Sequence, residues 1–568
     1  MFRHMLSLFS LRISKGVRHS EDDSDFDMDD KEILYTKKSK ELESKWMSYE
    51  FFIYYWIIFF SVIFSLKTTY DISNTSHHNY AQFSGLLRSG WIGKRKMDNT
   101  DIQYAVFRRN VPILIFASTI HLSLGSFSNY VIKHFKILND VQRRILYNNI
   151  YSFIFLIILH GTSIIKIYTI AYINYSISCI FSKNKLNPIL TWFFNVGILF
   201  LNDIYKGYLF GSFYHKLSFL DRYNGFVPRW QIYFNTTILR FISYNLDYYW
   251  SLNNDVSEKL SDSQLTEKNR INSSCFHADY CLLNFFSYVF YAPLYFSGPI
   301  ISFNNFISQL RYPSKDITIL STIKYFLRLL FCFFLLELIL HFFYVVAISK
   351  TKSWKNYSPF QISMIGYFNL QIIWFKLLLI WRFFRLWALC DKIDPPENMV
   401  RCINNNYSFL GFWRAWHRSF NRWIIRYIYL PLGGSKFLVL NIFVIFTFVA
   451  LWHDITLRLF AWGWLITLFI LPEIIAYHIF HSKEWEDWPY YRHLCALGAT
   501  VNIIMMMIAN LVGFSLGIEG TKDMFTRIFI NYQNFFFLVS LFCTLFAAVQ
   551  IMFEIRNHEK RNGVFLRY

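Results

Sequence analysis

The sequence predicts an all-α, polytopic membrane protein, and three observations support this fold class. Hydrophobic residues make up 54% of the 568 residues and aromatic residues 21%, and the mean hydropathy is +0.27. A soluble protein of this length cannot bury so much apolar surface. Several apolar runs also reach the roughly 18 residues that cross about 30 Å of hydrocarbon. Because backbone groups in a bilayer must be satisfied internally, we expect these runs to be helices.

The chain is expected to have two parts. Residues 1–45 hold a basic start, the acidic block 21–30 and then further lysines, with few aromatic residues. Such a charge-dense segment cannot form a core, so we predict a disordered amino-terminal tail. Residues 46–568 are predicted to form a single transmembrane domain.

The transmembrane domain contains apolar stretches separated by polar connections. From their lengths and charge content we expect about ten to twelve membrane helices. Basic residues flank several stretches on both sides, so the orientation of the termini stays open. The stretches are 49–66, 111–129, 150–181, 188–212, 279–300, 318–349, 364–390, 437–454, 457–475, 495–517 and 530–554.

The formal charge of +20 has two interpretations. Lysine and arginine accumulate at lipid headgroups in any membrane protein. They also suit a phosphate-rich substrate such as acyl-coenzyme A or a phospholipid. Nucleic acid is not expected as a partner, because the basic residues are spread between the spans. The eight cysteines form no Cys-x-x-Cys pair, so we expect no metal site and no resident cofactor.

The segment 412–434 combines arginines, a histidine and aromatic residues. At helical spacing, its aromatic side chains, including Trp416, share one face, and Arg414 and three later arginines share another. The pattern predicts an amphipathic helix that ends at Pro431 and the glycine pair Gly433–Gly434. Two interpretations remain open: an interfacial helix with snorkelling arginines, or the wall of a cavity that contains His417.

His453 and Asp454 lie at the end of an otherwise apolar span. An ionisable residue at membrane depth is costly and therefore indicates a functional site. Histidine titrates near neutral pH and can take a proton from a hydroxyl group. The alternative is a histidine at the water boundary with an ordinary hydrogen bond.

The segment 291–300 interrupts an apolar stretch with Pro293, Gly298 and Pro299. Broken helices at membrane depth are tolerated where they line a cavity. A simple kink is the other interpretation.

Four blocks in series resemble the membrane-bound O-acyltransferase (MBOAT) family, and within it the glycerol-uptake and hedgehog-acyltransferase subgroup. They are Tyr-Ala-Pro-Leu-Tyr-Phe-Ser-Gly-Pro at 291–299, Arg-Ala-Trp-His-Arg-Ser-Phe-Asn-Arg-Trp at 414–423, Arg-Tyr-Ile-Tyr-Leu-Pro-Leu-Gly-Gly at 426–434 and Leu-Trp-His-Asp at 451–454. The resemblance covers about residues 220–475 and does not extend to the tail.

This resemblance implies an MBOAT-like fold that encloses a tunnel, in which an acyl donor meets a hydroxyl acceptor. It implies that His453 and His417 are catalytic, His453 as general base and His417 as an orienting or polarising group. We further expect Trp416, Asn421, Arg414, Trp452 and Asp454 to bind substrate. The donor would be acyl-coenzyme A, as a substrate and not as a cofactor.

The acceptor and the location are implied by the resemblance alone. The glycerol-uptake branch implies a lysolipid acceptor, a lyso-form glycosylphosphatidylinositol (GPI) that is remodelled in the endoplasmic reticulum membrane. The alternatives are a protein acceptor, as in hedgehog acyltransferase, a transporter of glycerol or another small solute, and a catalytically silent scaffold. Acyl length and oligomeric state stay open.

Overall fold

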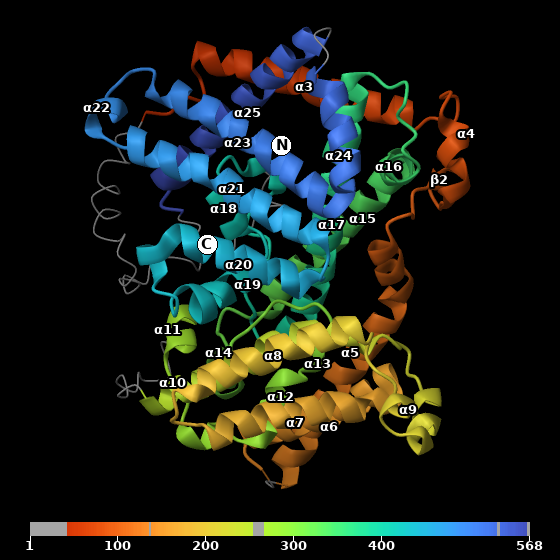
Figure 1. Ribbon diagram of the computed structural model, residues 1–568, viewed down its shortest axis with the longest axis vertical. Helices are drawn as coiled ribbons and strands as arrows, with labels where there is room; N and C mark the ends of the chain where they lie inside the picture. Colours follow the sequence, from red (N-terminus) through yellow and green to blue (C-terminus); the bar gives the residue numbers. More distant parts are fainter. Residues whose placement is uncertain (1–42, 136–137, 254–265, 531–533, 565–568) are drawn as a thin grey trace.

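The computed structural model describes residues 43–135, 138–253, 266–530 and 534–564 (Figure 1). The predicted all-α class is confirmed, since these residues form helices joined by turns and one small hairpin. In the hairpin, β1 (Arg88–Ser89) pairs antiparallel with β2 (Lys96–Met97), and Arg88 lies opposite Met97. The predicted disordered tail lies outside the described residues up to position 42.

The first and last of the described helices, α3 and α25, lie together at one end of the molecule (Figure 1). There α3 packs against α25, and α25 packs against α23. The elements of the amino-terminal part are α3 (Tyr49–Ile72), α4 (Tyr80–Phe83), η1 (Ser84–Leu86) and α5 (Ile102–Phe135).

The opposite end of the molecule is built from α6 to α13 (Figure 1). Buried asparagines join three of its helices: the Asn195 amide of α8 donates to Asn174 of α7 (2.9 Å), and the Asn174 amide donates to Asn245 of α10 (3.1 Å). The elements are α6 (Asp140–His160), η2 (Gly161–Ser163), α7 (Ile164–Ile180), α8 (Leu186–Ile204), α9 (Phe210–Phe213), η3 (His215–Arg222), α10 (Trp230–Asn253), α11 (Glu267–Asn272), η4 (His277–Asp279), α12 (Leu282–Val289) and α13 (Ala292–Tyr295).

The remaining elements form the middle and the other end of the molecule. Ser358 begins the long helix α17 with a capping box to Gln361, and Pro359 occupies its first turn. The elements are α14 (Phe303–Arg311), α15 (Ile319–Phe342), α16 (Val345–Thr351), α17 (Pro359–Cys390), η5 (Ile403–Asn405), α18 (Phe409–Ala415), α19 (Arg418–Ile424), the π-helix η6 (Ile425–Tyr429), η7 (Gly434–Phe437), α20 (Leu438–His453), α21 (Leu457–Phe480), α22 (Lys483–Glu486), α23 (Tyr491–Asn510), the π-helix η8 (Leu511–Ser515), α24 (Gly517–Phe525), the π-helix η9 (Thr526–Ile530) and α25 (Phe535–Arg561).

Among the described residues, seven helical segments are long and apolar enough to cross a membrane, and up to eight if the bent pair α15–α16, with its 50° bend, is one span. This count is below the expected ten to twelve. The stretch 279–300 is split into short helices, and α8 and α17 carry buried polar side chains that lower their hydropathy. The seven are Tyr49–Ile72, Ile102–Val131, Asp140–Ile180, Gly434–His453, Leu457–Phe480, Tyr491–Ser515 and Phe535–Arg561.

The segment 412–434 differs from the predicted single helix. It consists of α18, α19 and η6, with a break at Trp416 and His417, where His417 has φ 47°. The loop that contains Asn398 and Met399, called the Asn398 loop below, causes this break. Met399 forms a β-bridge with Trp416, and Asn398 accepts hydrogen bonds from the Arg418 and Ser419 amides (both 3.1 Å). Hydrogen bonds to this loop therefore replace the intrahelical hydrogen bonds that a continuous helix would form at Arg418 and Ser419.

Candidate active site

A cavity of about 960 Å³ lies among α8, α10, α17 and the elements from α18 to α21. This volume is in the range of small-molecule binding sites. One face of α20 supplies an apolar wall that leads toward the end of the helix. The side chains of this wall are Leu438, Ile442, Ile445, Phe446 and Val449.

His453 is the last residue of α20 and lines the cavity. The preceding Trp452 is buried and anchors the helix end, since its indole nitrogen donates to the Asn235 carbonyl (3.0 Å). The His453 ring has aromatic neighbours at 4.7 Å (Trp452) and 5.9 Å (Phe514). The His453 side chain is exposed and lines the cavity.

His417 lines the same cavity from the break between α18 and α19. Its left-handed backbone costs roughly 1–2 kcal/mol for a residue with a Cβ. The Asn398 loop described above stabilises this conformation. The imidazole stacks on Trp381 of α17, with 4.4 Å between ring centroids and 22° between planes. The break therefore directs a rigidly held ring into the cavity.

The two histidines are close enough to interact. Both rings lie beside Trp452, at 6.3 Å for His417 and 4.7 Å for His453. Burial lowers the pKa of His417, and repulsion from a protonated His453 would lower it further. His417 is therefore neutral at pH 7. Within the part of the chain that the structure describes, neither imidazole has a hydrogen-bond partner, so both can bind a substrate.

All the residues predicted to bind substrate line this cavity: Trp416, Asn421, Arg414, Trp452 and Asp454. Asn421 lies one helical turn after His417, and its amide nitrogen is buried with no partner among the described residues. Asp454 is extended, with φ −177°, and begins the turn between α20 and α21. Geometry thus brings these residues together, while their roles stay predictions.

The arginines of segment 412–434 have different environments. Arg414 lines the cavity, whereas Arg422 pairs with Glu267 (2.7 Å) and Arg426 pairs with buried Asp247 (2.9 Å). The predicted basic face is therefore divided between the cavity and two ion pairs, and it is not a simple snorkelling face.

The broken segment 291–300 forms another wall, as the cavity interpretation expected. Ser297, Gly298 and Ile300 line the cavity. Buried Arg240 of α10 fixes the break by donating to the Val289 carbonyl (2.7 Å) and the Leu294 carbonyl. Carbonyls at a helix end carry partial negative charge, so a buried cation is stabilised there.

Several cavity residues were not predicted from the sequence. Trp381, Trp462 and Phe514 surround the histidines, and Lys206 and Arg229 line the cavity from the loops beside α8 and α10. Arg229 lies in a Pro-Arg-Trp motif, which is a weak local signal. Trp381 carries no signal, because only tertiary packing places it beside His417.

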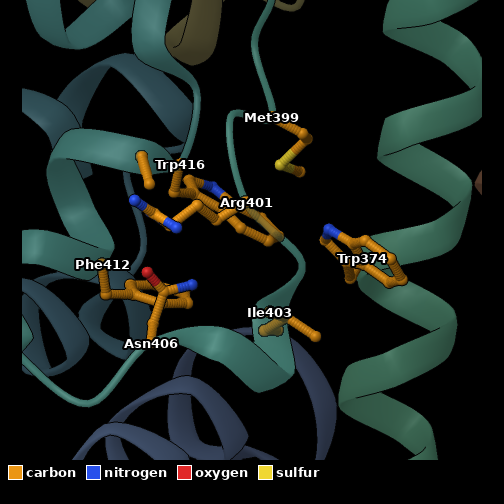
Figure 2. Close-up of a pocket in the computed structure, with 8 residues that line it drawn as sticks. Trp374, Met399, Arg401, Ile403, Asn406, Phe412 and Trp416 are labelled. Carbon is orange, nitrogen blue, oxygen red and sulfur yellow. The ribbon is translucent and has the colours of Figure 1, made fainter. Parts of the chain in front are cut away.

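A much smaller gap lies behind Trp416. Figure 2 shows Trp374 reaching from α17 toward the loop that carries Met399 and Ile403. The gap holds about 10 Å³, which is roughly the space of one water molecule. It is therefore too small for a substrate. In the described ranges, no group of three or more His, Cys, Asp or Glu side chains could hold a metal ion.

Comparisons with known proteins agree with the motif pattern. The model of the membrane-bound O-acyltransferase family matches residues 190–518. The chain is 44% identical to membrane-bound O-acyltransferase gup1 of Schizosaccharomyces pombe, over 90% of each chain. It is 44% identical to GUP1 of Saccharomyces cerevisiae, over 92% of this chain and 94% of that protein. Similarity to mouse protein-cysteine N-palmitoyltransferase HHAT is 29% over 43% of this chain and 52% of that protein.

Proposed function

Because the chain belongs to the membrane-bound O-acyltransferase family, we propose that this multi-pass acyltransferase moves a long-chain acyl group from acyl-coenzyme A to a lipid hydroxyl. The acceptor in this proposal is a lyso-GPI lipid that is remodelled in the endoplasmic reticulum membrane. The observation that carries the proposal is that His417 and His453 face one cavity with a long apolar wall.

The cavity fits an acyl chain that ends at His453. The apolar face of α20 belongs to a helix of 16 residues, which spans roughly 24 Å. An acyl chain along this face would place its thioester beside His453. The surrounding Trp452, Trp462 and Phe514 would exclude water and so suppress hydrolysis of the thioester.

In the proposed reaction, His453 takes the proton of the acceptor hydroxyl as that oxygen attacks the thioester carbon. The C–O bond forms, the C–S bond breaks, and the departing thiolate receives the proton from His453. Neutral His417 orients or polarises a reacting group. General-base assistance of this kind contributes about 10²–10⁴-fold to a rate.

The deciding experiment uses purified protein in lipid nanodiscs with labelled palmitoyl-coenzyme A. Label should appear in a lyso-GPI acceptor, and GPI anchors from cells depleted of the protein should accumulate in the lyso form. Label in a cysteine-containing peptide instead would favour a protein acceptor, as the name of the mouse protein-cysteine N-palmitoyltransferase suggests for that relative. If no acceptor is labelled, while the protein carries glycerol into liposomes, the transporter alternative holds.

A further inference from the structure

Besides Arg414, two cations line the cavity without a carboxylate partner among the described residues. Lys206 and Arg229 line it, and within the described residues neither belongs to an ion pair. Many other arginines are paired, such as Arg108 with Glu337 (2.8 Å) and Arg401 with Glu559 (2.7 Å). An unpaired cation beside a cavity can accept a negatively charged ligand without first losing a partner.

The backbone that carries Lys206 is strained. Three successive residues have positive φ: Lys206 (50°), Gly207 (89°) and Tyr208 (36°). Such conformations are unfavourable for residues other than glycine, and they persist only where the surroundings impose them. Strain of this kind is common at ligand sites, where it places a side chain that regular structure cannot place.

Neighbouring groups hold this conformation and connect it to the start of α10, directly after Arg229. The Trp230 indole nitrogen donates to the Gly207 carbonyl (3.2 Å), and the Lys166 ammonium donates to the Tyr208 carbonyl (2.6 Å). A Cβ at Gly207 would lie only 2.7 Å from the Gln231 amide oxygen. Gly207, which follows Lys206, therefore packs directly against Trp230 and Gln231, which follow Arg229.

An independent polar group lies beside these cations. The amide nitrogen of Asn202 is buried and has no partner among the described residues, although its oxygen accepts from Tyr208 (2.9 Å). Asn202 and Gln231 also line the cavity. Asp203 lines the cavity on the same helix as Asn202, so Lys206 and Arg229 together outweigh its charge at this part of the lining.

We propose that Lys206 and Arg229 form an anion subsite of the cavity that binds a phosphate group of a substrate. Arginine recognises phosphate through two parallel hydrogen bonds, and lysine adds a point charge. Two sources share this chemistry: the nucleotide phosphates of the acyl donor, and the phosphate of a phospholipid acceptor. The proposal rests on the proposed acyl transfer, which it deepens by assigning where the charged part of a substrate binds.

The test compares Lys206→Ala/Arg229→Ala with Lys216→Ala/Arg222→Ala, which removes two exposed cations of the adjacent η3 that do not line the cavity. Lost charge-assisted hydrogen bonds should raise the KM for the anionic substrate by at least about tenfold. If the donor is bound, the KM for palmitoyl-coenzyme A rises and that for palmitoyl-pantetheine does not. If the acceptor is bound, the KM for a lysophospholipid rises and that for monoacylglycerol does not.

The subsite would be overturned if Lys206→Ala/Arg229→Ala had the KM values of the wild type with every substrate. It would also be overturned if Lys216→Ala/Arg222→Ala raised the same KM values by the same factor. Binding of adenosine 3′,5′-bisphosphate and of glycerol 3-phosphate, measured by calorimetry, separates this result from failure of the proposed function. If the wild type transfers no acyl group, selective loss of probe binding in Lys206→Ala/Arg229→Ala still supports the subsite, and unchanged or undetectable probe binding refutes it.

Discussion

At the scale of single residues, His453 and His417 differ in how they are held. His453 ends a continuous helix and is exposed to the cavity, whereas His417 is held at a strained break and stacks on Trp381. An accessible ring suits proton transfer, and a rigidly stacked ring suits orientation of a substrate. We therefore expect substitution of the two histidines to lower the rate of acyl transfer by different factors.

Replacement of His453 by Ala should lower acyl transfer by at least about 10²-fold, the contribution of a general base. His417→Ala should lower it less. Rates of labelled acyl transfer by purified variants check this order. His478→Ala, an exposed position of α21 that does not line the cavity, is the control and should retain activity. Equal rates for wild type and His453→Ala would refute the catalytic role.

The lowered pKa of His417 predicts a pH dependence of stability. Its folded-state pKa lies below the unfolded value of about 6.5, so the folded state binds fewer protons than the unfolded state at acidic pH. Stability should therefore fall as the pH drops below about 6.5. His417→Gln should reduce this fall. Thermal unfolding of both proteins at several pH values measures this fall in stability, and identical pH profiles would contradict the lowered pKa of His417.

At the scale of elements, the π-helix η6 is coupled to α10 by buried polar contacts. Arg426 pairs with Asp247, and the Tyr427 hydroxyl donates to the same carboxylate (3.0 Å). π-Helical turns are rare and often occur at functional sites. Here the turn places Ile425 and Tyr429 on the cavity wall. The ion pair is therefore expected to determine the shape of that wall.

Breaking this pair should be more harmful than removing it. Asp247→Asn or Arg426→Met alone leaves a buried charge without its partner and should destabilise the protein by about 3–5 kcal/mol. The double variant should recover part of that loss. Unfolding free energies of the four proteins form a double-mutant cycle. Additive losses would show that the two side chains are not coupled.

At the scale of the whole molecule, the sequence predicts the fold class and the catalytic candidates but not their full surroundings. His453 and His417 are identifiable because ionisable residues are rare among apolar ones. The break at His417 is not, since the Asn398 loop that causes it is distant from the local pattern. Trp381 and Lys206 are likewise brought to the cavity by packing between elements, which periodicity does not encode.

Deletions from the amino terminus test which residues before α3 are needed for acyl transfer and which are needed for stability. The described chain already contacts the last helix near its start: the Lys45 amide donates to Glu554 (3.2 Å), and Arg561 donates to the Glu43 carbonyl (3.4 Å). Because Glu554 is buried, these contacts should matter for the packing of α3 on α25. Residues before them precede every motif of the cavity.

Deletion of residues 1–40 should therefore leave acyl transfer and abundance unchanged, because such charge-dense segments contribute no core. Deletion of residues 1–48 removes a hydrogen bond to the buried Glu554 carboxylate and should lower stability by roughly 1.5–3 kcal/mol. Thermal unfolding and acyl transfer of both truncated proteins in nanodiscs distinguish the two effects. Loss of transfer in the shorter deletion, with normal insertion and stability, would make the tail a regulatory or substrate-binding element.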